Sequence, residues 1–67
     1  MSEITQRQQQ ILSFIQDFHG KNHWAPSVRE IADGVGLYST STVQNHLVKM
    51  QEKKKIIYNG VRQIRVL

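Results

Sequence analysis

The chain of 67 residues contains no cysteine, and this absence limits how it can fold. Disulfides and the commonest structural zinc sites, which hold many small domains together, are both excluded. The fold must therefore rest on a packed apolar core alone. Because a chain of this length has room for one core, we expect residues 1–67 to form a single domain.

Apolar residues near the N-terminus recur at helical spacing. They are Ile11, Leu12, Phe14, Ile15 and Phe18. Thr5 and Gln8 have the spacing of a capping box, in which the threonine side chain caps the helix and the glutamine reaches back to the cap amide. Gly20 offers a left-handed stop. The sequence therefore predicts a first helix over residues 6–19.

A second, shorter helix is predicted after Pro26, a residue that disfavours helical geometry at Ala25. Ser27 and Glu30 repeat the capping-box spacing, and Gly36 is placed to end the helix after about two turns. The stripe expected to be buried comprises Val28, Ile31, Ala32 and Val35.

A third helix is predicted over about residues 40–54. Ser39 is the favoured N-cap, although Ser41 and Gln44 also have capping-box spacing. One face, expected in the core, carries Val43, Leu47 and Met50. The opposite face carries Ser41, Gln44, Asn45, Val48, Lys49 and Glu52. At its start this outer face is short, uncharged and rich in groups that both donate and accept hydrogen bonds.

The pattern changes after the third helix. Residues 56–58 and 63–67 are rich in β-branched and apolar side chains, and Asn59-Gly60 between them is the strongest short hairpin signal. The expected fold is therefore mainly α with a small β-hairpin: a winged helix-turn-helix of three helices and a two-stranded wing.

Positive charge is concentrated at the C-terminal end. Residues 1–48 carry three basic and four acidic side chains, a net charge of 3 − 4 = −1, whereas residues 49–67 carry six and one, a net charge of 6 − 1 = +5. A localised basic surface is typical of proteins that bind nucleic acid. A solvated lysine cluster that only keeps the chain in solution is the alternative interpretation.

Enzyme chemistry finds little support in the sequence. His19, His23 and His46 lack partners at zinc-ligand spacing, and we interpret them as packing or surface residues. There is no glycine-rich phosphate loop or serine-nucleophile motif. We therefore expect no enzymatic activity, no cofactor and no metal. Trp24 is expected to cover the core rather than to stack on bases.

No apolar run is long enough for a membrane span, and the first residues lack the pattern of a signal peptide. We therefore expect no membrane partner and a cytoplasmic location.

The outer face of the third helix suits readout of DNA in the major groove, which admits an α-helix. Gln44 and Asn45 could pair with adenine, and Ser39, Ser41 and Thr42 suit mixed contacts or a thymine methyl. Lysines 53–55, together with Tyr58, Asn59 and Arg62 of the wing, would lie over phosphates, and Tyr38 could reach one through its hydroxyl.

Four stretches of this chain resemble the N-terminal DNA-binding domain of LexA-type repressors. They are Thr5-Gln6-Arg7-Gln8-Gln9-Gln10-Ile11, Ala25-Pro26-Ser27-Val28-Arg29-Glu30-Ile31-Ala32, Val35-Gly36-Leu37 and Ser39-Thr40-Ser41-Thr42-Val43-Gln44-Asn45-His46-Leu47. The resemblance continues through Ile57 and the wing to Leu67. Thr40 and Ala25 depart from it, since each stands where the family often has proline.

The resemblance implies a repressor that inserts its third helix into the major groove of a double-stranded operator and blocks transcription. It implies base-reading roles for Ser39, Ser41, Thr42, Gln44 and Asn45, and a place for Arg7 near the DNA backbone. The full set expected at the backbone is Arg7, Ser27, Arg29, Tyr38, Lys49, Lys53, Lys54, Asn59 and Arg62.

Family members continue into a second domain that dimerises and cleaves itself in the SOS response, and this sequence stops before it. The sequence is therefore either an excised fragment or a stand-alone regulator of the kind that phages or mobile elements encode, and we favour the second. A stand-alone regulator would form a homodimer that is weak or assembles on DNA. The alternative is a protein-interaction module that binds a host repressor or polymerase. Such a module would carry large apolar anchors on the third helix, where only Val48 is apolar.

Overall fold

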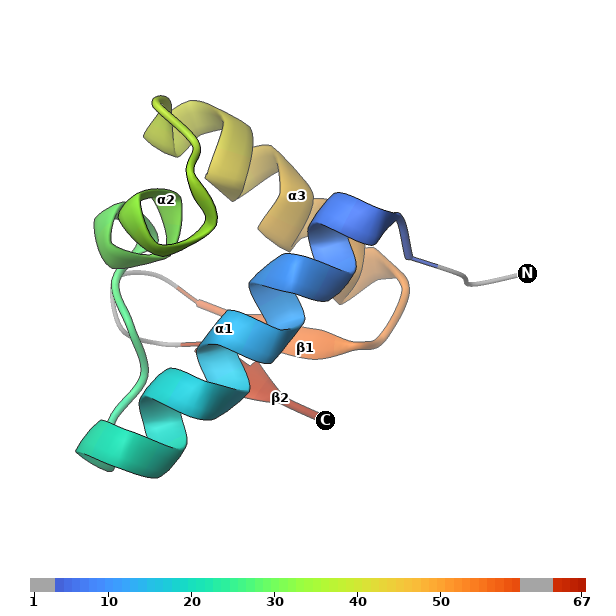
Figure 1. Ribbon diagram of the computed structural model, residues 1–67. Coiled ribbons are helices and arrows are strands. Elements are labelled where there is room, and N and C mark those ends of the chain that lie inside the picture. The colour runs from blue at the N-terminus through green and yellow to red at the C-terminus, as the bar shows by residue number, and fades with distance from the viewer. Residues whose placement is uncertain (1–3, 60–63) are drawn as a thin grey trace.

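The computed structural model describes residues 4–59 and 64–67 (Figure 1). Its elements are α1 (Gln6–Asn22), α2 (Val28–Val35), α3 (Thr40–Glu52), β1 (Ile56–Tyr58) and β2 (Ile64–Val66). The two strands form an antiparallel hairpin, and α1 packs against α2, α3 and β2. This order confirms the predicted winged helix-turn-helix fold.

Helix α1 begins with the predicted capping box. The Gln8 backbone N–H donates to Thr5 Oγ1, and the Thr5 N–H donates to Gln8 Oε1, both at 3.1 Å. The prediction that Gly20 ends the helix is wrong. Gly20 stays helical and α1 continues to Asn22, because His23 takes the left-handed conformation (φ 64°) and its N–H donates to the His19 carbonyl. Histidine is one of the side chains that tolerate this conformation.

Helix α2 has both predicted ends. Ser27 and Glu30 cap each other at 2.8 and 3.2 Å, and Gly36 closes the helix at φ 78°. Ser39 is the N-cap of α3, as predicted, but its side chain makes no capping hydrogen bond. Helix α3 ends at Glu52 rather than near residue 54, because Lys54 turns left-handed (φ 62°) and leads the chain into β1.

The hairpin pairs Ile56 with Val66 and Tyr58 with Ile64, so residues 59–63 connect the strands. A two-residue loop at Asn59-Gly60 would pair Tyr58 with Val61 instead and turn Ile64 away from the core. Ile56 and Ile64 are both buried, which explains the longer connection, since burial of one face fixes strand register.

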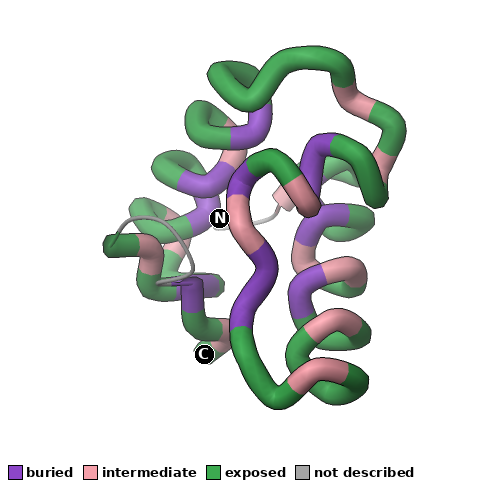
Figure 2. The backbone as a smooth tube through the Cα atoms, turned by 90° about the vertical axis from the view of Figure 1, so that its left-hand side faces the viewer, coloured by how far each residue is buried: buried purple, intermediate pink, exposed green. Residues whose placement is uncertain are grey.

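The buried residues come from every element, and the buried stretches of the backbone tube face the middle of the molecule (Figure 2). The core consists of Ile11, Ile15, Ala25, Val28, Ile31, Ala32, Val43, Leu47, Met50, Ile56 and Ile64. The prediction that Trp24 covers this core does not agree with its side chain, which is 54% exposed. The next two residues, Ala25 and Pro26, are buried instead. No helix in the described ranges is both long and apolar enough to cross a membrane.

Candidate nucleic-acid interface

Helix α3 separates a core face from a polar outer face. Val43, Leu47 and Met50 are completely buried. The five predicted base-reading residues, Ser39, Ser41, Thr42, Gln44 and Asn45, are all exposed. They therefore lie together at the N-terminal end of α3, on the sides that do not pack against the core.

The turn before α3 gathers further predicted residues. Arg29, Tyr38 and Ser39 line one open hollow of about 490 Å³ between α2 and the start of α3. The Tyr38 side chain is fully exposed, and Asp33 contributes a carboxylate to the same hollow. Arg29 and Tyr38 thus adjoin the polar start of α3.

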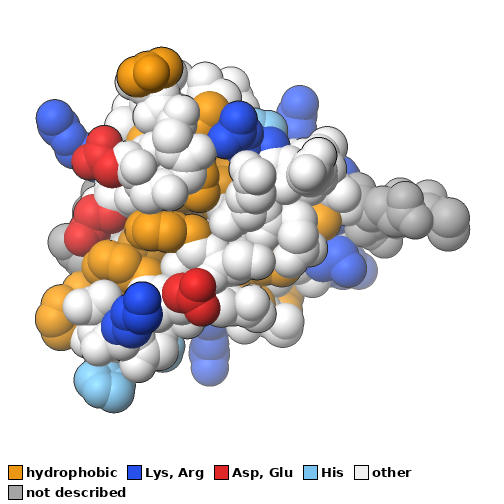
Figure 3. Space-filling model, viewed as in Figure 1, with side chains coloured by type: hydrophobic (Ala, Val, Ile, Leu, Met, Phe, Trp, Pro, Cys, Tyr) orange, Lys and Arg blue, Asp and Glu red, His pale blue; other side chains and the backbone are white. Residues whose placement is uncertain are grey.

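The other residues expected at the DNA backbone are more scattered. Lys49, Lys54 and Asn59 are exposed, and Lys53 is partly buried. The Ser27 hydroxyl accepts the Glu30 N–H in the α2 cap, so that it already has a structural role. Arg62 lies outside the described residues. On the face viewed in Figure 3, Lys and Arg side chains spread over several sides rather than forming one patch.

Arg7 has a contact that the sequence did not predict. Its Nη1 donates to the Val35 carbonyl at 2.8 Å, across a sequence separation of 28 residues. Val35 is the last residue of α2, where carbonyls have no partner within the helix. The Arg7 side chain therefore links α1 to the end of α2 while it remains exposed.

Within the part of the chain that the structure describes, Gln8 is the one polar side chain buried in the core, with an exposed fraction of 2%. Besides the Thr5 N–H, its Oε1 accepts from Lys53 Nζ at 3.3 Å, and its Nε2 lies 3.3 Å from His46 Nδ1. This cluster joins the start of α1 to α3. The capping-box pattern predicts only a cap role for Gln8, although its spacing from Ile11 and Ile15 puts it on the apolar stripe.

Burial lowers the pKa of His46 below its usual value, and the nearby positive charges of Lys49 and Arg7 lower it further. Each of these effects disfavours the imidazolium. His46 is therefore biased toward its neutral form in the folded chain.

The family model of the LexA DNA binding domain matches residues 1–60. The chain belongs to the LexA DNA-binding domain family. Among its relatives, the LexA repressor of Shouchella clausii is 47% identical over 53 residues, which are 79% of this chain and 26% of the relative. The LexA repressor of Syntrophomonas wolfei is 49% identical over 51 residues, 76% of this chain and 25% of the relative. The chain thus spans about a quarter of the length of these curated relatives.

The two departures from the LexA pattern are accommodated locally. Thr40, in place of a proline, is an exposed first residue of α3. Ala25, in place of the first proline of a pair, is buried in the core. Neither substitution interrupts a helix.

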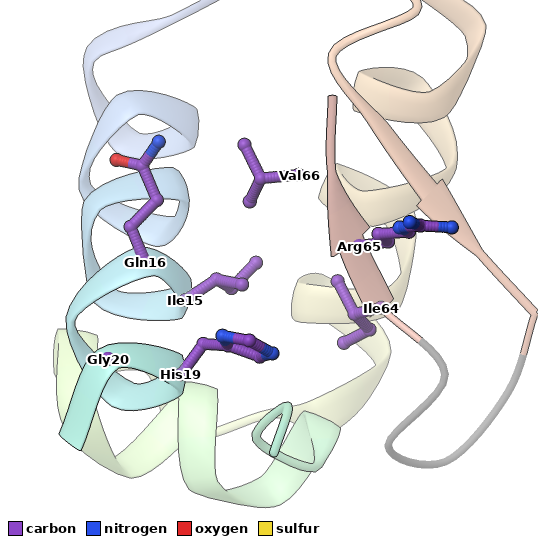
Figure 4. A pocket seen from close by; sticks show the side chains of 7 residues that line it. All are labelled: Ile15, Gln16, His19, Gly20, Ile64, Arg65 and Val66. Carbon is purple, nitrogen blue, oxygen red and sulfur yellow. The ribbon is translucent and has the colours of Figure 1, made fainter. Parts of the chain in front are cut away.

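A second hollow of about 430 Å³ lies between α1 and the wing of this LexA-family fold. Ile15, His19, Ile64 and Val66 point toward it, whereas the Arg65 side chain points away (Figure 4). Among the described residues that line the hollow, His19 is the one imidazole and none carries a carboxylate. Within residues 4–59 and 64–67, no group of three His, Asp or Glu side chains could hold a metal ion.

Proposed function

We propose that this chain, acting as one DNA-binding unit, recognises a double-stranded operator sequence and represses transcription. The observation that carries the proposal is α3, whose core face is fully buried while its N-terminal polar residues are exposed together. A major groove admits such a helix and presents donors and acceptors to it. Membership of the LexA DNA-binding domain family supports the same function.

The base-reading roles follow from side-chain chemistry. Gln44 and Asn45 each carry an amide that can pair with adenine N6 and N7. Ser39 and Ser41 can donate or accept, and the Thr42 methyl suits the methyl group of thymine. All five side chains are exposed in the fold, which leaves them free to meet base edges.

Contacts to the phosphates would hold the helix in register without reading sequence. We assign this role to Arg7, Ser27, Arg29, Tyr38, Lys49, Lys53, Lys54, Asn59 and Arg62. Arg29 and Tyr38 adjoin the start of α3, which supports their assignment. Arg7 and Ser27 would act from side chains that also hold structural hydrogen bonds.

Selection of bound duplexes from a random DNA library at near-physiological salt tests the proposal. We expect one sequence motif to be enriched. An inverted repeat would indicate two copies on the DNA, and a lone half-site would indicate a monomer. Recovery of unselected sequence would reject sequence-specific recognition. It would favour the protein-interaction alternative or nonspecific architectural binding to DNA. Against a protein-binding face, Val48, at 45% exposed, is the one large apolar side chain exposed on α3.

Asn45→Ala then tests the readout directly on the selected duplex. The loss should be about 1–3 kcal/mol on that duplex, with little change on random DNA, because an adenine would lose its amide partner. Gln16→Ala, an exposed change on α1, is the matched control and should bind as the wild type does. Equal losses on selected and random DNA would rule out base reading by Asn45.

A further inference from the structure

We propose that Gln8 is a positioning residue for DNA binding: its buried amide holds the Lys53 ammonium at the end of α3 and keeps His46 neutral, with the proton on Nε2. The inference rests on the proposed DNA-binding function, in which Lys53 meets a phosphate. Gln8 itself is 2% exposed and would act through the two side chains that it contacts.

The orientation of the Gln8 amide follows from its partners. The Thr5 N–H and the Lys53 ammonium are both donors, and both contact Oε1, at 3.1 and 3.3 Å. A flipped amide would set its NH₂ group against these donors. The oxygen must therefore face Thr5 and Lys53, which leaves Nε2 to face His46 Nδ1 at 3.3 Å.

This orientation decides the state of His46. Since Gln8 Nε2 can only donate, His46 Nδ1 must accept, and the imidazole proton lies on Nε2. An imidazolium would turn an N–H of its own against the amide. The charged groups around the ring, Arg7 on α1 and Lys49 on α3, act in the same direction. The Lys53 ammonium is the other charged group at this cluster, and it contacts the amide oxygen of Gln8.

The contact matters most for Lys53, which caps the C-terminal end of α3. A lysine side chain loses rotamer freedom when it binds a phosphate, and this loss weakens binding. A side chain already held by Gln8 has lost part of that freedom in the free protein. Because an ammonium has three donors, it can bind Gln8 and a phosphate oxygen together.

A double-mutant cycle in DNA affinity tests the positioning role. Fluorescence anisotropy with a labelled duplex would compare the wild type with Gln8→Leu, Lys53→Met and the double variant. We expect each single change to weaken binding roughly two- to tenfold, the range of one hydrogen bond, and the double variant to bind no more weakly than Lys53→Met. Gln10→Leu, the same change at an exposed position of α1, should leave affinity unchanged.

Independent losses that multiply in the double variant, or wild-type affinity in Gln8→Leu, would overturn the proposal. A wild type that binds no duplex would instead reject the proposed function. If Gln8→Leu does not fold, Gln8→Glu provides the second test in the NMR measurement that follows. Its carboxylate still offers an acceptor to the Thr5 N–H and the Lys53 ammonium.

Nitrogen NMR of the imidazole in the free protein tests the arrangement without DNA. We expect His46 to carry its proton on Nε2 in the wild type. In Gln8→Glu the carboxylate can accept from Nδ1–H, so the pKa of His46 should rise above its wild-type value. Protonation of Nδ1 in the neutral wild-type ring, or an unchanged pKa in Gln8→Glu, would overturn the assignment.

Discussion

A proton on His46 Nδ1 would displace the hydrogen bond that this atom accepts from Gln8 Nε2, and this competition should make the stability of the fold depend on pH. Burial, together with Lys49 and Arg7, lowers the pKa of His46 in the folded chain. The unfolded chain therefore binds a proton at a higher pH than the folded chain does. The contribution of neutral His46 to the free energy of unfolding is therefore complete above the unfolded pKa of about 6.5. It is lost as the pH falls below that value and through the folded pKa.

Urea denaturation at pH 7.5 and pH 5.5 would measure this effect. The wild type should lose more of its free energy of unfolding at the lower pH than His46→Asn does, since asparagine cannot be protonated. Gln10→Asn, an exposed change on α1 that retains His46 and every other titratable group, is the control and should keep the wild-type difference between the two pH values. An identical pH dependence in the wild type and His46→Asn would contradict the prediction.

At the scale of helices, α1 and α2 approach each other where Gly34 meets Phe14. A Cβ built on Gly34 would overlap the Phe14 ring, which itself packs on Phe18 with centroids 5.9 Å apart. Gly20, also in a helix, has open space at the Cβ position. Gly34→Ala should therefore destabilise the fold by about 1–3 kcal/mol, and Gly20→Ala should stabilise it by about 0.5–1 kcal/mol.

Urea unfolding midpoints of the two variants give the comparison, because helix propensity favours alanine at both positions and only packing differs. A stabilised Gly34→Ala would show that the Phe14 ring moves aside at little cost. Similar shifts in both variants would mean that the contact between α1 and α2 does not limit Gly34.

Much of the element order could be predicted because its signals are local. The capping boxes at Thr5 and Ser27 and the stop at Gly36 depend on residues a few positions apart. The end of α1 could not be predicted in this way. A glycine such as Gly20 permits a left-handed conformation without requiring one, and His23 adopts that conformation instead. The length of the hairpin connection depends on the burial of Ile64, which local turn signals do not record.

The same distinction applies to the site. The outer face of α3 follows from helical periodicity, so its exposed polar residues could be predicted. The contacts of Arg7 with Val35, Gln8 with His46 and Lys53 with Gln8 span 28, 38 and 45 residues. Pairs so distant in the sequence meet only after the helices pack, and a single sequence does not specify them.

At the scale of the whole molecule, the charge distribution makes a prediction about salt. The net charge is +4, and the basic excess lies after residue 48. If about five phosphates are neutralised, the logarithm of affinity should fall with the logarithm of salt concentration at a slope of roughly −4 to −5. The contribution of one lysine to this slope depends on whether it meets a phosphate, not only on its charge.

Two exposed lysines allow charge and contact to be separated. Lys54 follows α3, whereas Lys21 lies in the last turn of α1, and neither lysine contacts Gln8. Lys54→Ala should weaken binding to all sequences alike and flatten the slope by about 1, because one phosphate contact is lost. Lys21→Ala removes the same charge and should leave the slope nearly unchanged. Binding titrations of both variants across a range of salt concentrations measure the two slopes. Equal flattening in both variants would mean that the net charge of the molecule, rather than contacts beside α3, sets its electrostatic attraction to DNA.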